Sequence, residues 1–144
     1  MNATAGGGRV VVGVDGSAPS EDAVAWAAGQ AELIGAELEL VTAWEWPSTY
    51  GAPMVLPEQF NPAGDAERLL VDTEAAVKRA HPGLSVRRST AEGHPAPILV
   101  EASKGATLLV VGSRGHGAFI GMVLGSVSEH CVTNAHCPVV VVRH

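Results

Sequence analysis

The residues of this chain best suited to binding chemistry are glycines and serines that follow an apolar run near position 110. Gly112–Gly115 comes directly after Leu108–Val111, and nine residues separate Gly115 from Gly125 and Ser126. Glycine lets the backbone approach a ligand closely and adopt positive φ, so that successive amides can point at an anion. Serine hydroxyls in the same region can donate too, namely those of Ser113, Ser126 and Ser128. The segment from Gly112 to Ser126 therefore predicts a cradle for the phosphates of a nucleotide.

A second candidate site lies near the start of the chain, where Gly13-Val14-Asp15-Gly16-Ser17 follows three valines. In open α/β sheets, ligands bind beyond the carboxyl ends of the strands, where the winding direction reverses. We also expect Gly125–Ser128 to open a helix, whose free amides and positive dipole end favour phosphate. Backbone groups of this kind would let a chain of net charge −6 hold a polyanion with few cations.

Other nucleotide-binding and catalytic motifs are missing from the sequence. No Gly-Lys-Ser/Thr is present, and Gly115, Gly117 and Gly121 miss the G-x-G-x-x-G spacing. There is no G-x-S-x-G nucleophile elbow. The glycine segment holds no evident general base, and no carboxylate pair near it suits a metal-activated water. We therefore expect a binding protein rather than an enzyme, with slow hydrolysis or autophosphorylation left open.

Composition and charge exclude several classes of protein. The chain has 144 residues, 47% of them apolar, which fits one domain with a substantial core. A net charge of −6 and nine scattered basic residues argue against nucleic-acid binding. No apolar run approaches the roughly 20 residues that span a bilayer, and Met1–Gly8 lacks the pattern of a signal peptide. We expect a cytoplasmic protein that binds neither nucleic acid nor membrane.

The two cysteines, Cys131 and Cys137, are too few for a disulfide framework. Together with His130 and His136 they suggest zinc as an alternative. His130 and Cys131 are adjacent on an expected helix, however, and would point about 100° apart, which is poor geometry for one metal. We therefore interpret Cys131 as a small core residue and expect no metal site.

Five runs rich in β-branched residues alternate with helical stretches. The expected strands are Arg9–Asp15, Glu37–Ala43, Leu84–Ala91, Thr107–Val111 and Pro138–Val142. The expected helices are Ala18–Ile34, Ala63–Ala80, Pro95–Lys104 and Ser126–Asn134. This alternation predicts an α/β fold in which an open parallel sheet has right-handed crossovers and helices on both faces. Residues 1–8 are expected to be a flexible tail and residues 9–144 a single domain.

Local signals support these boundaries. Ser17 is placed to cap the first helix and Gly35 to end it. The segment Trp44–Pro62 has no clean periodicity, and a loop of that length is usually functional or mobile. Within it, we interpret Trp44 and Trp46 as residues that pack the loop rather than as a stacking platform.

The combination of motifs resembles the universal stress protein family. It consists of G-x-x-G, nine residues and then G-S, after a strand ending Leu-Leu-Val-Val and with V-D-G-S at the end of the first strand. The resemblance runs from Arg9 to Arg143 and includes Leu-Val-Thr-Ala in the second strand and the closing Cys-Pro-Val-Val-Val-Val. G-x-x-G alone is a weak signal, whereas the combination at matching positions is specific.

The resemblance implies a Rossmann-like sheet of five strands in the order 3-2-1-4-5, similar to the adenine nucleotide α-hydrolases. It also implies homodimers and binding of ATP, with or without Mg²⁺, by a sensor or signalling adaptor of the stress response. Pro138–Val142 would then be an edge strand, which is suited to antiparallel pairing with the same strand of a second chain.

The nucleotide-binding residues that the resemblance implies lie in three groups. The first group would line the base and ribose and consists of Gly13, Val14, Asp15 and Ala43. The other two groups would wrap the ribose and phosphates. They are Gly112, Ser113, Arg114, Gly115 and His116 after the fourth expected strand, and Gly125, Ser126, Val127 and Ser128 at the start of the last expected helix. Ala43 departs from the family in being small, so adenine would pack loosely unless Trp44 compensates.

Several alternatives stay open at this point. The ligand could be AMP or a cyclic nucleotide, or the chain could be a dimeric interaction module of the same fold that binds no nucleotide. Asp15 could cap the first helix, contact the ligand or do both. Arg114 and His116 could equally be solvent-facing loop residues. An α-hydrolase activity would need catalytic residues that this chain does not supply.

Overall fold

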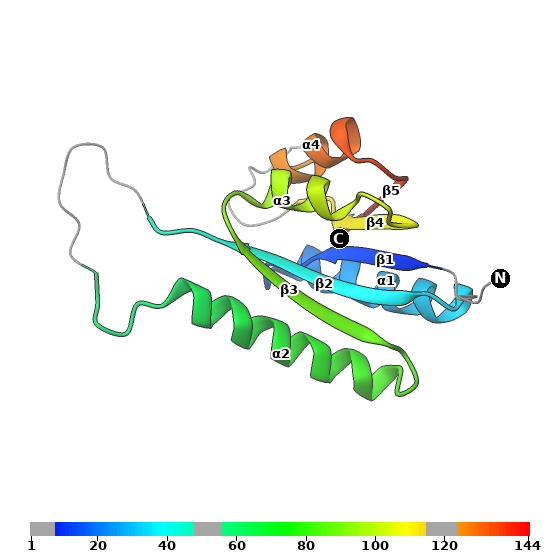
Figure 1. Ribbon diagram of the computed structural model, residues 1–144, viewed down its shortest axis with the longest axis horizontal. Helices are drawn as coiled ribbons and strands as arrows, with labels where there is room; N and C mark the ends of the chain where they lie inside the picture. Colours follow the sequence, from blue (N-terminus) through cyan, green and yellow to red (C-terminus); the bar gives the residue numbers. More distant parts are fainter. Residues whose placement is uncertain (1–7, 48–55, 115–123) are drawn as a thin grey trace.

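The computed structural model describes residues 8–47, 56–114 and 124–144 of the chain. These residues form a five-stranded sheet in the order β3-β2-β1-β4-β5, in which every pairing is parallel (Figure 1). The strands are β1 (Arg9–Gly13), β2 (Glu37–Trp44), β3 (Val86–Glu92), β4 (Leu108–Gly112) and β5 (Val139–Val142). The predicted fold class and strand order are thus confirmed.

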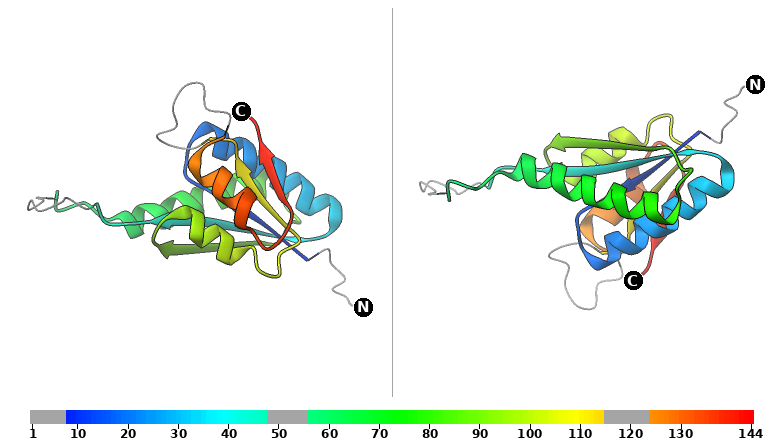
Figure 2. Two further views of the ribbon diagram at one scale, coloured as in Figure 1. Left: turned by 90° about the horizontal axis from the view of Figure 1, so that it is seen from above. Right: turned by 90° about the horizontal axis from the view of Figure 1, so that it is seen from below.

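Two helices cover each face of the sheet. They are α1 (Ala18–Ile34), α2 (Pro62–Ala80), α3 (Pro95–Ala102) and α4 (Ser126–Asn134). Val10 and Val12 of β1 lie in the core beneath α1 and α2, whereas Val11 lies in a second core with residues of α3 and α4. Figure 2 shows α3 and α4 in front of the sheet from above, and α1 and α2 in front of it from below. None of the helices in the described part of the chain has the length and apolar character needed to cross a bilayer.

The signals read at the ends of α1 act as predicted. The Ser17 hydroxyl accepts a hydrogen bond from the amide of Ser20 at 3.3 Å, and Pro19 stands in the first turn. Gly35 ends the helix in the left-handed conformation, with φ of 73°. Its amide and the amide of Ala36 then take up carbonyls of the last turn. Helix α1 therefore begins and ends at the predicted residues.

Two boundaries differ from the prediction for identifiable reasons. Strand β3 begins at Val86 rather than Leu84, because the Leu84 side chain is buried in the core while its carbonyl accepts a hydrogen bond from Nζ of Lys78 at 2.9 Å. Strand β1 ends at Gly13 rather than Asp15, since the Asp15 amide turns away to donate to Oγ of Ser20 at 3.0 Å.

Helix α3 also stops earlier than predicted, at Ala102 rather than Lys104. The guanidinium of Arg9 donates to the carbonyl oxygens of Ala102 at 2.9 Å and Lys104 at 2.8 Å, so it satisfies acceptors at the helix end. It also pairs with the buried Glu39 of β2 at 2.7 Å, and Ser89 of β3 donates to the other carboxylate oxygen. Arg9 therefore fastens the start of β1 to β2 and to the end of α3.

Gly112 should be intolerant of any side chain. A Cβ built on Gly112 lies 2.8 Å from the carbonyl oxygen of Pro19, which is backbone at the start of α1. Gly112→Ala would force α1 away from β4, and we expect the free energy of unfolding to fall by about 1–3 kcal/mol, as overpacked cores do. Urea denaturation measures this.

The matched control is Gly29→Ala in the middle of α1, where a Cβ meets no atom within 4 Å. Removing a helical glycine there should raise the free energy of unfolding by about 0.5–1 kcal/mol. If the two alanine variants proved equally stable, the close packing at Gly112 would be refuted.

Candidate functional site

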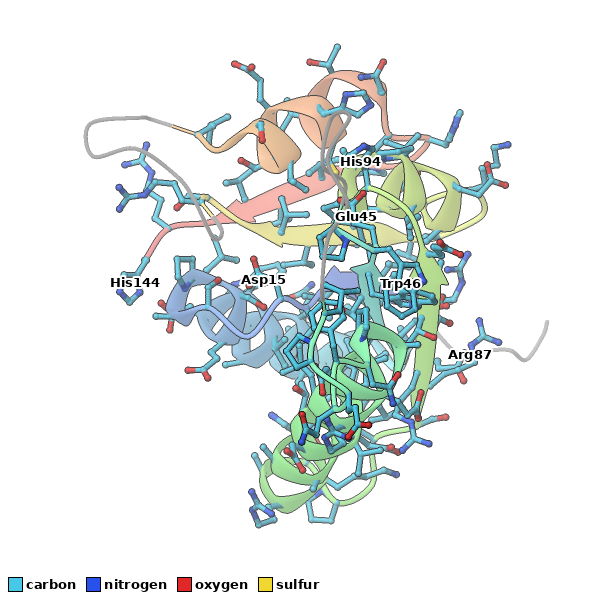
Figure 3. All side chains as sticks on the ribbon, turned by 90° about the vertical axis from the view of Figure 1, so that its left-hand side faces the viewer. Asp15, Glu45, Trp46, Arg87, His94 and His144 are labelled. Carbon is cyan, nitrogen blue, oxygen red and sulfur yellow. The ribbon has the colours of Figure 1, made fainter. Side chains whose placement is uncertain are left out.

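Strands β1, β2 and β4 end at one edge of the sheet because they are parallel neighbours. Among the predicted residues, Gly13 is the last residue of β1, and Val14 and Asp15 follow it. Ala43 is the second-to-last residue of β2, and Gly112 is the last residue of β4. The topology therefore brings the first predicted group and the described members of the second, Gly112–Arg114, to a common edge. Figure 3 looks at the molecule from the side on which β2 ends and labels Asp15 there.

The end of β4 and the start of α4 are joined directly. The amide of Gly125 donates to the carbonyl oxygen of Ser113 at 2.7 Å. The Ser128 hydroxyl lies 3.0 Å from the same carbonyl and 3.0 Å from that of Gly125. Ser113 and Ser128 are buried. The two halves of the predicted phosphate cradle are thus held together by backbone and hydroxyl contacts across about a dozen intervening residues.

Helix α4 presents an amide-rich end at this junction. Gly125 is its N-cap residue, with φ of −77° and ψ of 168°, and no side-chain cap bond is seen within the part of the chain that the structure describes. The first bond inside the helix runs from the amide of Glu129 to the carbonyl of Gly125 at 3.0 Å. The amides of the first turn precede that bond, so they have no partner within the helix. An anion placed here would meet these amides and the positive end of the helix dipole.

The predicted serines have different environments. Ser126 is exposed at the beginning of α4, where its hydroxyl is accessible to solvent. The Ser128 hydroxyl is buried and directed to carbonyl oxygens, so its role in the structure is to hold the junction. Val127 is half-buried and packs against the core beneath α3 and α4. Ser113 donates its own amide to the carbonyl of Val142 at 2.8 Å, which ties the junction to β5.

Asp15 shapes the turn between β1 and α1. Its Oδ1 accepts hydrogen bonds from the amide of Ser17 at 2.9 Å and from the Ser17 hydroxyl at 2.5 Å. Ser17 in turn caps α1 through Ser20. Asp15 therefore does not cap α1 itself, because the N-cap residue is Ser17, and the Asp15 carboxylate instead holds Ser17 in place. The side chain is exposed at the edge of the sheet, which leaves a contact with a ligand available to the same residue.

Glycines at the strand ends serve close packing of helices. A Cβ at Gly13 would lie 2.9 Å from Cδ1 of Leu99 in α3, just as one at Gly112 would meet the backbone of Pro19 in α1. Packing alone therefore accounts for these two glycines. Ala43 is half-buried and pairs with Ala91 of β3.

The remaining predicted site residues are only partly placed. Arg114 is half-buried immediately after Ser113. Gly115 and His116 lie outside the described residues, so their predicted contacts with ribose and phosphate stay predictions.

The aromatic and cysteine side chains follow the structural interpretations. The rings of Trp44 and Trp46 meet edge to face with centroids 6.4 Å apart, and Trp46 also packs on Phe60 at 5.7 Å. Cys131 is fully buried, and burial raises the pKa of its thiol to about 11. No group of three or more His, Cys, Asp or Glu side chains that could hold a metal occurs in residues 8–47, 56–114 and 124–144.

One ion pair at this edge was not predicted. Nδ1 of His94 lies 3.1 Å from Oε2 of Glu45, which joins the start of α3 to the end of β2 (Figure 3). The sequence contained only a weak signal for this pair, a histidine directly before Pro95 and therefore beside a helix start.

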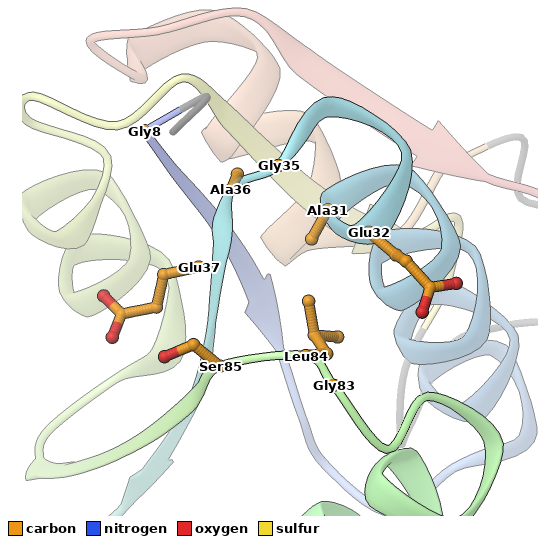
Figure 4. Close-up of a pocket in the computed structure, with 9 residues that line it drawn as sticks. All are labelled: Gly8, Ala31, Glu32, Gly35, Ala36, Glu37, Gly83, Leu84 and Ser85. Carbon is orange, nitrogen blue, oxygen red and sulfur yellow. The ribbon is translucent and has the colours of Figure 1, made fainter. Parts of the chain in front are cut away.

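Two hollows have acidic side chains in their linings. One of about 390 Å³ lies between α1 and α2, where Glu21 and Asp72 line it together with Val14 of the predicted base group. The other, of about 580 Å³, lies where β2 begins, opposite the edge described above (Figure 4). Its two charged lining residues, Glu32 and Glu37, are acidic. Carboxylates in both linings would repel phosphate.

Comparison with known proteins gives a consistent result. The model of the universal stress protein family matches residues 8–143. A universal stress protein of Mycolicibacterium smegmatis is 37% identical over 134 residues, which are 93% of this chain and 45% of that protein. The chain thus spans about half the length of the curated relatives it matches.

Complexes with adenine nucleotides are among the solved structures that this chain resembles. A universal stress protein in complex with cAMP is 30% identical, with a TM-score of 0.68 over 93% of this chain and 94% of that one. A universal stress protein of Archaeoglobus fulgidus in complex with dAMP has the same TM-score of 0.68 at 19% identity, over 93% and 96% of the two chains. The second likeness shows the fold alone.

Ser128→Ala should loosen the junction between β4 and α4. The substitution removes a buried hydroxyl that reaches two carbonyl oxygens, and we expect the free energy of unfolding to fall by about 1 kcal/mol. Ser126→Ala, two residues away on the exposed side of the same turn, is the matched control and should change it by less than about 0.5 kcal/mol. Urea denaturation of both variants decides the matter, and an equal loss in the two would argue against the junction.

Proposed function

The chain belongs to the universal stress protein family, and we propose that it binds an adenine nucleotide, foremost ATP, at the carboxyl edge of β1 and β4. In this proposal it acts as a nucleotide-dependent sensor or signalling adaptor and not as an enzyme. The observation that carries the proposal is the junction of Ser113 with Gly125 and Ser128, which holds the N-terminus of α4 at the edge where Asp15 lies.

Phosphate recognition would come from backbone groups rather than from cations. The first-turn amides of α4 and the exposed hydroxyl of Ser126 supply donors on one side. The glycines at the ends of β1 and β4 keep side chains away from the strand ends. Such a site suits a protein of net charge −6, because it concentrates positive potential locally without altering the overall charge.

Selection of an adenine nucleotide rests on two lines of support. The family member bound to cAMP is 30% identical over nearly all of this chain. In this chain, the exposed carboxylate of Asp15 stands at the end of the central strand, where it could accept hydrogen bonds from ribose hydroxyls. The triphosphate is the proposed ligand because the first-turn amides of α4 and the exposed hydroxyl of Ser126 add donors beyond those at the end of β4.

The proposal excludes efficient catalysis for a physical reason. Among the described residues at this edge, Asp15 is already engaged by Ser17 and Glu45 is paired with His94. A carboxylate that is already engaged in this way is a poor general base for activating a water that attacks phosphorus. Nucleotide occupancy, rather than turnover, would then be the signal passed to partners.

Titration calorimetry with ATP, AMP and cAMP, with and without Mg²⁺, tests the proposal. Asp15→Ala should weaken ATP and adenosine alike by about 1–3 kcal/mol, the cost of losing a charge-assisted hydrogen bond. The matched control is Ser17→Ala, which removes the cap of α1 but leaves the carboxylate. It should lower stability by about 1 kcal/mol with nearly normal affinity.

Two results would count against this assignment. If Asp15→Ala lost stability like Ser17→Ala but bound ATP normally, Asp15 would be a structural residue only. If the folded wild-type protein bound none of the three nucleotides, the chain would instead be the interaction module without a ligand.

We further propose that the protein forms homodimers through β5. In the sheet order β5 is an edge strand, and all four of its valines are only half-buried, although two face each core. An apolar edge strand without charged side chains is a site for pairing with another strand. Antiparallel pairing with the β5 of a second copy is self-complementary and closes as a twofold dimer. The dimer would leave the nucleotide edge open, because strand ends and strand flanks are different surfaces.

Val141→Lys should disrupt this pairing. Val141 lies in the core beneath α3 and α4 but is partly accessible at the edge, so a lysine would place a charge beside the partner strand. We expect light scattering to show a dimer for the wild type at micromolar concentration and monomers or aggregates for the variant. A wild-type protein that stays monomeric would refute the dimer, whereas nucleotide binding would be unaffected.

A further inference from the structure

Helix α1 carries two large apolar side chains that the fold leaves open to solvent. Trp26 is 40% exposed and Leu33 is 79% exposed. Both are on a helix whose inner face is formed by small buried residues such as Ala23, Ala27 and Ala31. Large apolar residues grouped on one side of an element mark a binding surface more often than single ones do.

The direction of the two side chains follows from helix geometry. Successive residues of an α-helix are rotated by about 100° about its axis. Measured from the buried Ala27 about this axis, Trp26 is rotated by about 100° and Leu33 by about 120° in the same direction. Ala28 and Glu32 lie in the other direction, and this is the side of α2, because Glu32 pairs with His81 at the end of α2. Trp26 and Leu33 therefore occupy the flank of α1 that faces away from α2.

The same flank lies beside β5. Asp22 shares its direction on the helix, about 140° round from Ala27, and Oδ2 of Asp22 lies 2.7 Å from Nδ1 of His144, two residues beyond the end of β5. Val140 and Val142 of β5 pack against the core under α1. The left panel of Figure 2 shows β5, in red, running alongside α1, in blue.

The flank is also centred on β5 along its length. The midpoint between Trp26 and Leu33 is about 11 Å along the helix from Asp22, at 1.5 Å per residue. The midpoint of β5 is about 12 Å back along the chain from His144, at 3.3 Å per residue. Because Asp22 and His144 are in contact, the two midpoints lie at nearly the same level.

We propose that this flank of α1 is a second part of the interface with another copy of the chain, in which Trp26 of one copy packs on Leu33 of the other. The inference rests on the dimer through β5 proposed above. A twofold axis through the middle of two paired β5 strands exchanges the levels above and below that middle. Trp26 and Leu33 lie on opposite sides of the middle of β5. Trp26 of one copy would therefore face Leu33 of the second copy, and Leu33 of the first copy would face Trp26 of the second.

The width of the gap explains why these residues are large. Helix α1 lies over β1 and β4. Neighbouring strands are about 4.8 Å apart. The axis of α1 would therefore be about 10 Å, two strand spacings, from the line midway between two paired β5 strands. The two α1 helices would then be about 19 Å apart, whereas a helix with its side chains is about 10–12 Å across. A tryptophan opposite a leucine, repeated by the twofold axis, would fill the remaining space on that face of the joined sheet.

The chain has three tryptophans, so Trp26 can be made its own reporter. In the variant Trp44→Phe/Trp46→Phe, Trp26 is the single tryptophan. Its emission should shift to longer wavelength as dilution dissociates the dimer, with the same midpoint as the change in mass seen by light scattering. If the dimer forms but the emission does not change across dissociation, the inference is overturned while the dimer through β5 stands. A variant that is monomeric at every concentration overturns both.

Substitutions provide an independent measurement in the otherwise wild-type chain. Trp26→Ala and Leu33→Glu should each raise the dimer dissociation constant about tenfold or more, as expected for a central apolar contact that occurs twice. Val71→Glu is the matched control, because Val71 is 42% exposed on α2, away from β5. It should leave the constant within about twofold. Equal effects of Leu33→Glu and Val71→Glu would refute the role of the flank.

Discussion

The position of β1 in the middle of the sheet is the constraint on which the rest of this structure depends. Val12 pairs with Leu40 of β2 on one side and Val110 of β4 on the other. Its neighbours Val11 and Val10 enter different cores. A strand that is hydrogen-bonded on both edges and buried on both faces cannot be reached by solvent except at its ends. A binding site on β1 is therefore restricted to the two ends of the strand, and the chain reverses its winding at the end where β1 stops.

The candidate site uses elements that the fold needs for other reasons. Gly13 and Gly112 have no side chain because α3 and α1 pack closely onto the strand ends at these two positions. Ser128 holds α4 against the end of β4 and so aims the helix N-terminus. Asp15 supports the cap of α1 while its side chain stays exposed. In the proposed function, stability and binding would thus be coupled through a few residues, and variants at this edge have to be measured for both.

Local signals and distant contacts differ in what the sequence reveals. The bounds of α1 and α4 were predicted residue for residue, because Ser17, Gly35 and Gly125 act within a few positions of themselves. The strand order followed from the family resemblance and is confirmed. The predicted end of α3 was wrong, because the guanidinium of Arg9, far away in the chain, donates hydrogen bonds to the carbonyl oxygens at the end of this helix. The direction of the Ser128 hydroxyl likewise depends on Ser113, which lies 15 residues earlier in the chain. The roles of Gly115 and His116 stay predictions.

The strand order also bears on how the chain is made. One core needs α1, α2 and the first three strands, so most of its residues have been synthesised once β3 is complete. Strand β1 nevertheless waits for β4, which begins at Leu108, before its second edge is paired. At roughly 5–20 residues per second, the ribosome takes about 1–4 s to add the residues from the end of β3 at Glu92 to the end of β4 at Gly112. During this interval a valine-rich strand has one open edge, and a half-made domain in a crowded cell is exposed to wrong pairing. The early core under α1 and α2, the larger of the two described cores, would be the nascent chain's protection against it.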